Sequence, residues 1–177
     1  MKRNELENIL RKYSKIYFER CEGRIIMRLA GRVFKSGKFW VIEVPILGIV
    51  TQGNSKKDAF DMIVDAIELL VNKKDFKVEV YSGKISYFEI ASKDVATLTA
   101  FLLRRQRMKH GLTLAEVSKR LGAKSFNTYA RYEQGRSVPT IEKFSLLLSA
   151  LSGNNDFVLT ESKKWGLSPL FTESQKK

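Results

Sequence analysis

The chain has 177 residues, of which 44% are hydrophobic, so it is long and apolar enough for one or two domains with their own cores. It carries 32 Lys and Arg against 19 Asp and Glu, a formal net charge of +13, which predicts a polyanionic partner. The excess is larger in the second half: residues 1–90 carry 17 basic and 12 acidic residues, whereas residues 91–177 carry 15 and 7.

Cysteine usage and hydropathy restrict the compartment. Cys21 is the only cysteine, which excludes an internal disulfide and favours a reducing environment. The start, MKRNELENILRK, lacks the apolar segment of a signal peptide, and no later apolar run approaches the ~20 residues of a membrane span. We therefore predict a cytoplasmic protein without a membrane partner.

Residues 1–26 are predicted to be an N-terminal extension. Leu6, Ile9 and Leu10 follow an approximate helical spacing among Lys and Arg, which predicts a short amphipathic helix. An alternative is that the extension is not translated, because Met27 begins a predicted strand and the codons just before it can form a purine-rich ribosome-binding site. We therefore hypothesise that the native protein starts at Met27.

Three strands are predicted next. Residues 27–35 (MRLAGRVFK) and 38–44 (KFWVIEV) have the β-branched and aromatic content of strands, and the SGK segment at 36–38 predicts a hairpin turn between them. Pro45 ends the second strand, because proline has no N–H to donate to a ladder. A third strand follows at residues 49–52.

A helix is predicted from a cap at Asn54 or Ser55 to about Asn72. Its apolar residues form a stripe that must cover a sheet. These residues are Ala59, Phe60, Met62, Ile63, Ala66, Ile67, Leu69 and Leu70. Two further strands, 76–81 and 84–90, flank a Ser-Gly turn. The order β-β-β-α-β-β predicts an antiparallel sheet with one helix on it.

Beyond residue 91 the apolar spacing becomes helical, which predicts a domain boundary near residues 91 to 93 and an all-α domain over 92–152, for an α+β chain overall. Ser92 or Asp94 caps its first helix. The inward-facing residues of that helix are Val95, Leu98, Phe101 and Leu102.

Residues 111–140 are predicted to form a helix-turn-helix. Thr113 and Glu116 form a capping box, in which each side chain bonds the backbone amide of the other, so a helix starts there. Gly122 ends this helix, because the reversal that follows requires a positive φ. Ser118 places a small side chain where a second helix can cross closely.

The second helix is predicted to start at Ser125 as N-cap, to run to about Glu133 and to end at Gly135. Tyr129 and Tyr132 share one face and are assigned to the core. The other face has groups that read base edges, since Asn pairs with adenine and Arg with guanine. The candidate DNA-binding residues are Lys124, Ser125, Phe126, Asn127, Thr128, Arg131 and Arg136.

The alternative for this face is an ordinary solvated helix surface. Two capped helices, a glycine turn and a set of basic flanking residues that would position phosphates favour DNA binding instead. The flanking residues are Arg104, Arg105, Arg107, Lys109, Lys119, Arg120, Lys124 and Arg136.

A closing helix over residues 140–151 is predicted to pack back on the helix-turn-helix. Its inward residues are Ile141, Phe144, Leu147 and Leu148. Residues 153–177 lack periodicity and are predicted to be a loose C-terminal tail, which Phe157, Trp165 and Phe171 would pin in places.

The segments GLTLAEVSKRLG and YARYEQGRSVPT resemble the Cro/C1 (Xre) type helix-turn-helix over about residues 94–151. That resemblance implies sequence-specific DNA binding. The segment between Gly122 and Tyr132 is one residue longer than the common pattern, which shifts the base-facing positions by about one residue.

The segment FWVIEVPILGIVTQGNSKKDAFDMIVDAIELL resembles the N-terminal domain of HicB-type antitoxins, over about residues 27–91. The matching residues are Trp40, Glu43, Pro45, Gly48, Thr51, Gln52 and Gly53. The usual second proline before Gly48 is missing, and the loop is one residue shorter. The resemblance implies a truncated RNase H-like fold without nuclease carboxylates.

The same resemblance implies an antitoxin that blocks a HicA-type mRNA-cleaving toxin and represses the shared operon as a homodimer or higher homo-oligomer on two-fold operator DNA. The alternative is a free-standing Xre regulator whose N-terminal domain senses something else. A nuclease is the third candidate, because it needs clustered carboxylates and the sequence shows no such cluster.

Residues with catalytic or metal-binding chemistry are sparse. His110, the only histidine, stands at a predicted helix end, where interaction with the helix dipole is expected. Glu43, Glu79 and Glu89 are expected on a solvated sheet face. We therefore predict no enzyme activity, no catalytic residues, no metal site and no cofactor.

Overall fold

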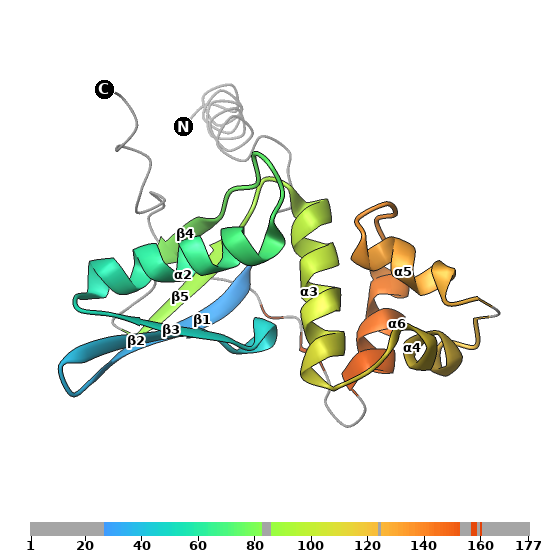
Figure 1. Ribbon diagram of the computed structural model, residues 1–177, viewed down its shortest axis with the longest axis horizontal. Coiled ribbons are helices and arrows are strands. Elements are labelled where there is room, and N and C mark those ends of the chain that lie inside the picture. Colours follow the sequence, from blue (N-terminus) through green and yellow to red (C-terminus); the bar gives the residue numbers. More distant parts are fainter. Residues whose placement is uncertain (1–26, 83–85, 124, 153–156, 159, 161–177) are drawn as a thin grey trace, which may run out of the picture.

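The computed structural model describes residues 27–82, 86–123, 125–152, 157, 158 and 160. The predicted N-terminal helix within residues 1–26, Lys124 and most of the C-terminal tail lie outside these residues, and the hypothesis of a start at Met27 stays a prediction. The chain forms a sheet half and a helical half with helix α3 between them (Figure 1). Among the described helices, none has the length and apolar character that a bilayer span requires.

The five predicted strands are present in the predicted order. They are β1 (Leu29–Ser36), β2 (Phe39–Val44), β3 (Ile49–Gly53), β4 (Glu79–Ser82) and β5 (Tyr87–Ala91), with a 3-10 turn η1 (Pro45–Leu47) after β2. The sheet order is β3-β2-β1-β5-β4, and every neighbouring pair is antiparallel. β4 starts three residues later than predicted, because Phe76 enters the core and its N–H bonds the Lys73 carbonyl at 3.2 Å.

One helix, α2 (Lys56–Val71), covers one face of the sheet (Figure 1). The predicted cap is confirmed, since Ser55 Oγ accepts from the Asp58 N–H at 3.0 Å. Gly53 allows the close approach of strand and helix: a Cβ there would lie 2.3 Å from the Ala59 backbone nitrogen. The helix packs through four buried residues, Ala59, Phe60, Ile63 and Ile67.

The apolar stripe of α2 is narrower than predicted. Met62, Leu69 and Leu70 are exposed, Leu69 to 78%. The correction follows from helix geometry, because a helix that lies on one sheet buries a single line of residues and turns the flanking positions to solvent.

The opposite face of the sheet combines apolar and paired charged residues. Phe34, Val50 and Tyr87 are exposed there, the last two by more than 60%. The sheet carboxylates have partners in this chain: Glu43 pairs with Arg32 at 2.6 Å, Glu89 with Arg28 at 3.1 Å, and Glu79 accepts from the Tyr81 hydroxyl at 2.5 Å. Within the described residues no group of three metal-ligating side chains occurs.

The helical half contains α4 (Leu114–Arg120), α5 (Asn127–Glu133) and α6 (Ile141–Ser152). Helices α5 and α6 pack on α3 (Val95–Lys109), and α4 packs on α5 and α6. Asp94 caps α3 as predicted, accepting from the Thr97 N–H at 3.0 Å. The core of this half consists of Leu103, Val117, Tyr129, Leu147, Leu148 and Leu151, and Phe157 packs against it. The prediction for Ile141 is wrong: it lies in the first turn of α6, is 80% exposed and has no neighbouring helix over it.

Helix α3 belongs to both cores. Leu98, Phe101 and Leu102 are buried with the sheet residues, whereas Leu103 is buried with the helical residues. Phe144 of α6 lies against both clusters. The predicted boundary near residues 91 to 93 falls between β5 and α3, but the first helix after it completes the core of the sheet half.

Candidate DNA-binding site

Helix α4 is built as the sequence predicts. The Glu116 N–H donates to Thr113 Oγ1 at 3.2 Å, and the Thr113 N–H donates to Glu116 Oε2 at 2.7 Å. The Thr113 amide and then its hydroxyl hold the pKa of Glu116 below its usual value. Gly122 has φ 65° and allows the reversal after α4, and the buried Ser118 donates to the Phe126 carbonyl at 3.4 Å where the two helices meet.

Helix α5 turns its aromatic face inward, as predicted. Tyr129 is fully buried and its hydroxyl lies 3.5 Å from the Leu103 carbonyl of α3. Burial, followed by the nearby Glu133 carboxylate, raises the pKa of Tyr129 well above its ordinary value. Tyr132 is half-buried against the same core. The orientation of α5 is therefore fixed by a large side chain.

The predicted N-cap of α5 is displaced by one residue. The capping position is Phe126, which makes no side-chain cap bond, and the helix begins at Asn127. Ser125 still contributes, since its Oγ accepts from the Asn127 N–H at 3.3 Å. The physical reason is a tight turn ahead of the helix, closed by the Thr128 N–H on the Ser125 carbonyl at 3.2 Å.

The exposed surface of α5 brings the predicted site residues together. Asn127, Thr128 and Arg131 are exposed and flank the buried Tyr129, and within the described residues their side chains have no hydrogen-bonding partner. Ser125 and Phe126 are exposed just before the helix, and Arg136 is exposed just after Gly135. Which of them contacts a base stays a prediction.

A bidentate ion pair holds the end of α5 on α3. Arg107 donates from Nε to Glu133 Oε1 at 2.7 Å and from Nη2 to Oε2 at 3.0 Å, and its Nη1 donates to the Leu112 carbonyl at 2.8 Å. The Glu133 side chain is only 6% exposed. The hydrogen bond to Glu133 raises the pKa of Arg107. Sequence spacing did not reveal this pair, which joins residues 26 positions apart.

Most of the basic residues predicted to flank the site bond to the chain itself. Arg104 donates to Leu70, Arg105 to Leu47 and Gly48, Arg107 to Glu133, Lys109 to Pro45, and Arg120 to Ala150. Each of these side chains has at least one acceptor within the chain, and its use as a phosphate contact stays a prediction. Lys119 and Arg136 remain exposed without a hydrogen-bonding partner among the described residues.

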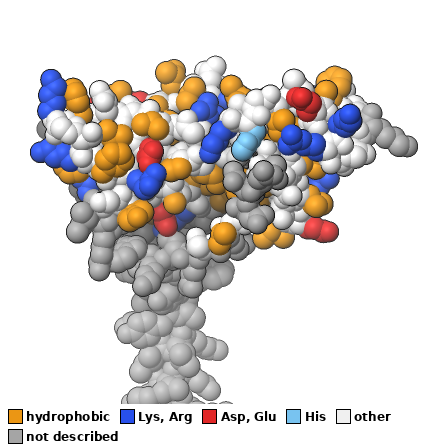
Figure 2. All heavy atoms as spheres, turned by 90° about the horizontal axis from the view of Figure 1, so that it is seen from below, with side chains coloured by type: hydrophobic (Ala, Val, Ile, Leu, Met, Phe, Trp, Pro, Cys, Tyr) orange, Lys and Arg blue, Asp and Glu red, His pale blue; other side chains and the backbone are white. Residues whose placement is uncertain are grey.

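Charge at the surface does not single out the site. Figure 2 shows Lys and Arg side chains spread over the face that lies below in Figure 1, across both halves. The exposed polar face of α5, rather than a dense basic patch on this side, is therefore the feature that points to DNA.

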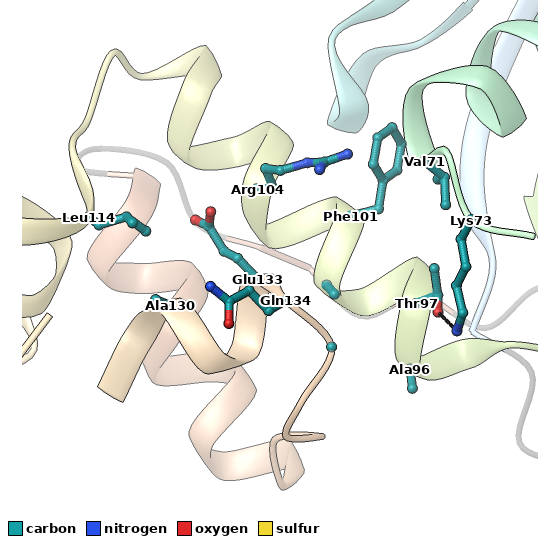
Figure 3. A pocket seen from close by; sticks show the side chains of 12 residues that line it. Val71, Lys73, Ala96, Thr97, Phe101, Arg104, Leu114, Ala130, Glu133 and Gln134 are labelled. Atoms are coloured by element: carbon teal, nitrogen blue, oxygen red, sulfur yellow. Dashed lines mark hydrogen bonds between the residues drawn. The ribbon is translucent and has the colours of Figure 1, made fainter. Parts of the chain in front are cut away.

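A groove of about 380 Å³ lies between α3, the end of α2 and the end of α5 (Figure 3). Val71 and Lys73 line its sheet side, and Glu133 and Gln134 line its helical side. Lys73 Nζ donates to Asp94 and Thr97, both at 2.7 Å. Lys73 therefore has acceptors within the chain, and among the described residues no group of metal-ligating side chains occurs here.

A helix-turn-helix family model matches residues 103–153, from within α3 through α4, α5 and α6. Residues 103–153 form a helix-turn-helix domain of the Cro/C1 type. This domain indicates sequence-specific DNA binding and a role in transcription regulation. The predicted resemblance of the helical half is thereby confirmed. No match to the chain was found among curated proteins.

Proposed function

We propose that this protein is a transcriptional repressor that reads operator DNA with helix α5 and inhibits a HicA-type toxin with its sheet half. The observation that carries the first part is the exposed row of Asn127, Thr128 and Arg131 on a helix whose other face is fixed by Tyr129. Amide and guanidinium groups recognise adenine and guanine bidentately in the major groove. The match to a helix-turn-helix supports this proposal, because the second helix of that motif commonly lies in the major groove.

Phosphate contacts would come from groups around α5 that have no hydrogen-bonding partner among the described residues. Lys119 at the end of α4 and Arg136 after Gly135 meet this condition. We further propose that the chain binds as a homodimer, because a two-fold operator requires two copies of α5 in successive major grooves.

The toxin-binding part rests on the resemblance of residues 27–91 to HicB-type antitoxins. The order of the five strands and α2 is compatible with the truncated RNase H-like fold that this resemblance implies. The face of the sheet away from α2 supplies a surface, since Val50 and Tyr87 are large, apolar and exposed on it. An mRNA-cleaving toxin covered by this half would be inactive.

We also propose that the protein is not an enzyme. Glu43 and Glu89, the carboxylates nearest the middle of the sheet, pair with Arg32 and Arg28. A two-metal nuclease needs carboxylates that converge on an ion rather than on a cation of the chain itself. Metal-dependent cleavage of nucleic acid by the purified chain would disprove this part of the proposal.

The DNA part is tested by selecting double-stranded sequences from a random pool with the full chain and comparing affinity for the selected sequence and for its scrambled version. Absence of any preference would refute it. The toxin part is tested by co-expression with the adjacent open reading frame. Growth rescue supports the antitoxin, and a neighbour without toxicity favours the free-standing regulator.

Two variants separate DNA binding from toxin inhibition. Arg131→Ala is expected to weaken operator binding, to relax its preference at one base pair and to keep growth protection. Tyr87→Ala combined with Val50→Ala is expected to keep operator binding and lose protection, since both side chains are exposed and little stability depends on them. If this double variant protects fully, the toxin does not bind this face.

A further inference from the structure

The turn between β2 and β3 is held by side chains of the helical half. Arg105 of α3 donates from Nε to the Leu47 carbonyl at 2.8 Å and from Nη2 to the Gly48 carbonyl at 3.0 Å. Gln106 donates to the Ile46 carbonyl. Lys109 Nζ lies 3.3 Å from the carbonyl of Pro45, the residue before Ile46. Four successive carbonyls of one turn thus accept from one face of α3.

These hydrogen bonds are partly shielded from solvent. Gln106 is 3% exposed, and the carbonyls of a single 3-10 turn have few partners within the turn. Gly48 adopts φ 61°, and a Cβ at this position would lie 3.7 Å from Arg105 Nη2. The path of the turn and the position of α3 therefore depend on each other.

The neighbouring face of α3 holds the recognition helix. Arg107 bonds Glu133 at the end of α5, and Leu103 accepts from the Tyr129 hydroxyl. The groove of Figure 3 separates the end of α2 from the end of α5, so the sheet half reaches α5 chiefly through α3. The helix α3 connects the β2–β3 turn to the surface that reads DNA.

We propose that Arg105 and Gln106 are positioning residues for sequence-specific DNA binding. They fix α3 on the turn formed by residues 45–48. Helix α3 in turn sets the angle at which α5 enters the major groove of the DNA. The sheet half is then part of the DNA-binding unit and not an independent module joined to it. This inference rests on the proposed function of α5 as the reading helix.

The first test compares Arg105→Ala and Arg105→Lys with Lys93→Ala in the full chain. Lys93 is exposed just before α3, so its loss removes the same charge without touching the turn. We expect both Arg105 variants to weaken operator binding about 3- to 30-fold. Affinity for scrambled DNA and the salt dependence should match the Lys93 control for Arg105→Ala and the wild-type chain for Arg105→Lys. Lysine keeps the charge but cannot reproduce the two-carbonyl fork.

Two results would overturn the proposal. Equal loss on operator and scrambled DNA, with a salt slope reduced by about one, would make Arg105 a phosphate contact. Unchanged operator affinity at a temperature well below a lowered melting point would make it a purely structural residue. If Arg105→Ala does not fold, Arg105→Lys carries the same comparison.

The second test changes the sheet half's side of the contact between the β2–β3 turn and α3. Gly48→Ala is compared with Gly37→Ala in the β1–β2 hairpin. Both glycines have a similar positive φ, 61° and 58°, but only Gly48 faces α3. Gly48→Ala is expected to weaken operator binding more than Gly37→Ala does. Equal effects of the two substitutions would refute the link. A wild-type chain without operator preference would instead refute the proposed function.

Discussion

Helices α3 and α5 both carry arginines in the more basic half of the chain, but they use them in opposite ways. Arg105 and Arg107 of α3 bond to carbonyls and to a buried carboxylate of the same chain. Arg131 of α5 and Arg136 beyond it are exposed and have no hydrogen-bonding partner in the described residues. The comparison teaches that net charge predicts a polyanionic partner, whereas the acceptors within the chain show which cations also have a structural role.

The largest effect is expected from removing α3, the helix whose side chains act within the chain, from the sheet half. A chain that ends at residue 91 lacks Leu98, Phe101 and Leu102, which are buried in the sheet core. Each such side chain contributes about 1.5–3 kcal/mol, so their joint loss approaches the whole stability of a small domain, about 5–15 kcal/mol. We expect residues 27–91 to lack a cooperative thermal transition.

A chain that ends at residue 110, just after α3, is the matched control. It keeps the three buried side chains and the bonds to the β2–β3 turn, and we expect it to melt cooperatively. A stable, cooperatively folded 27–91 fragment would show that α3 is dispensable for the sheet half.

The next largest effect concerns the ion pair between α3 and α5. Arg107→Ala leaves the Glu133 carboxylate, 6% exposed, without its cation and should destabilise the chain by about 3–5 kcal/mol. Urea unfolding of the full chain measures this change. The exposed Arg131→Ala is the control and should alter stability by no more than about 0.5 kcal/mol. Similar stability of the two variants would contradict the structural role of Arg107.

Local signals made much of this architecture predictable from the sequence. The Thr113–Glu116 box and Gly122 specify α4 within a few residues, and the succession of strands along the chain follows from alternation and turns. Pairings between distant residues were not predictable, because spacing carries no information about Arg107 meeting Glu133 or Arg105 meeting Leu47.

Two errors have the same origin. A periodic apolar stripe identifies the inward side of a helix, but it does not say how far the neighbouring elements extend. Leu69 of α2 and Ile141 of α6 continue their stripes and are nevertheless exposed, because no element covers these positions. The start of α5 shifted by one residue for a related reason, since its first turn is closed by the Ser125 carbonyl, which the side-chain pattern does not show.

On the DNA-binding side of the comparison, Arg131 is predicted to read a base. Its replacement by Ala should weaken operator binding by about 1–3 kcal/mol and relax the preference at one base pair. Affinities for an operator series substituted at each position measure this. If operator and scrambled DNA weaken equally, the shifted start of α5 places another side chain, such as Thr128, at the base edge.

The smallest expected effect distinguishes a phosphate contact from a base contact. Arg136 follows Gly135, whose φ of 66° turns the chain away from α5, so its side chain leaves the base-reading face. We expect Arg136→Ala to weaken operator and scrambled DNA alike and to lower the slope of log affinity against log salt by about one. Titrations of both DNAs at several salt concentrations decide the matter, with Lys93→Ala as the control for simple loss of charge. A loss confined to the operator would move Arg136 into the group of base-reading residues.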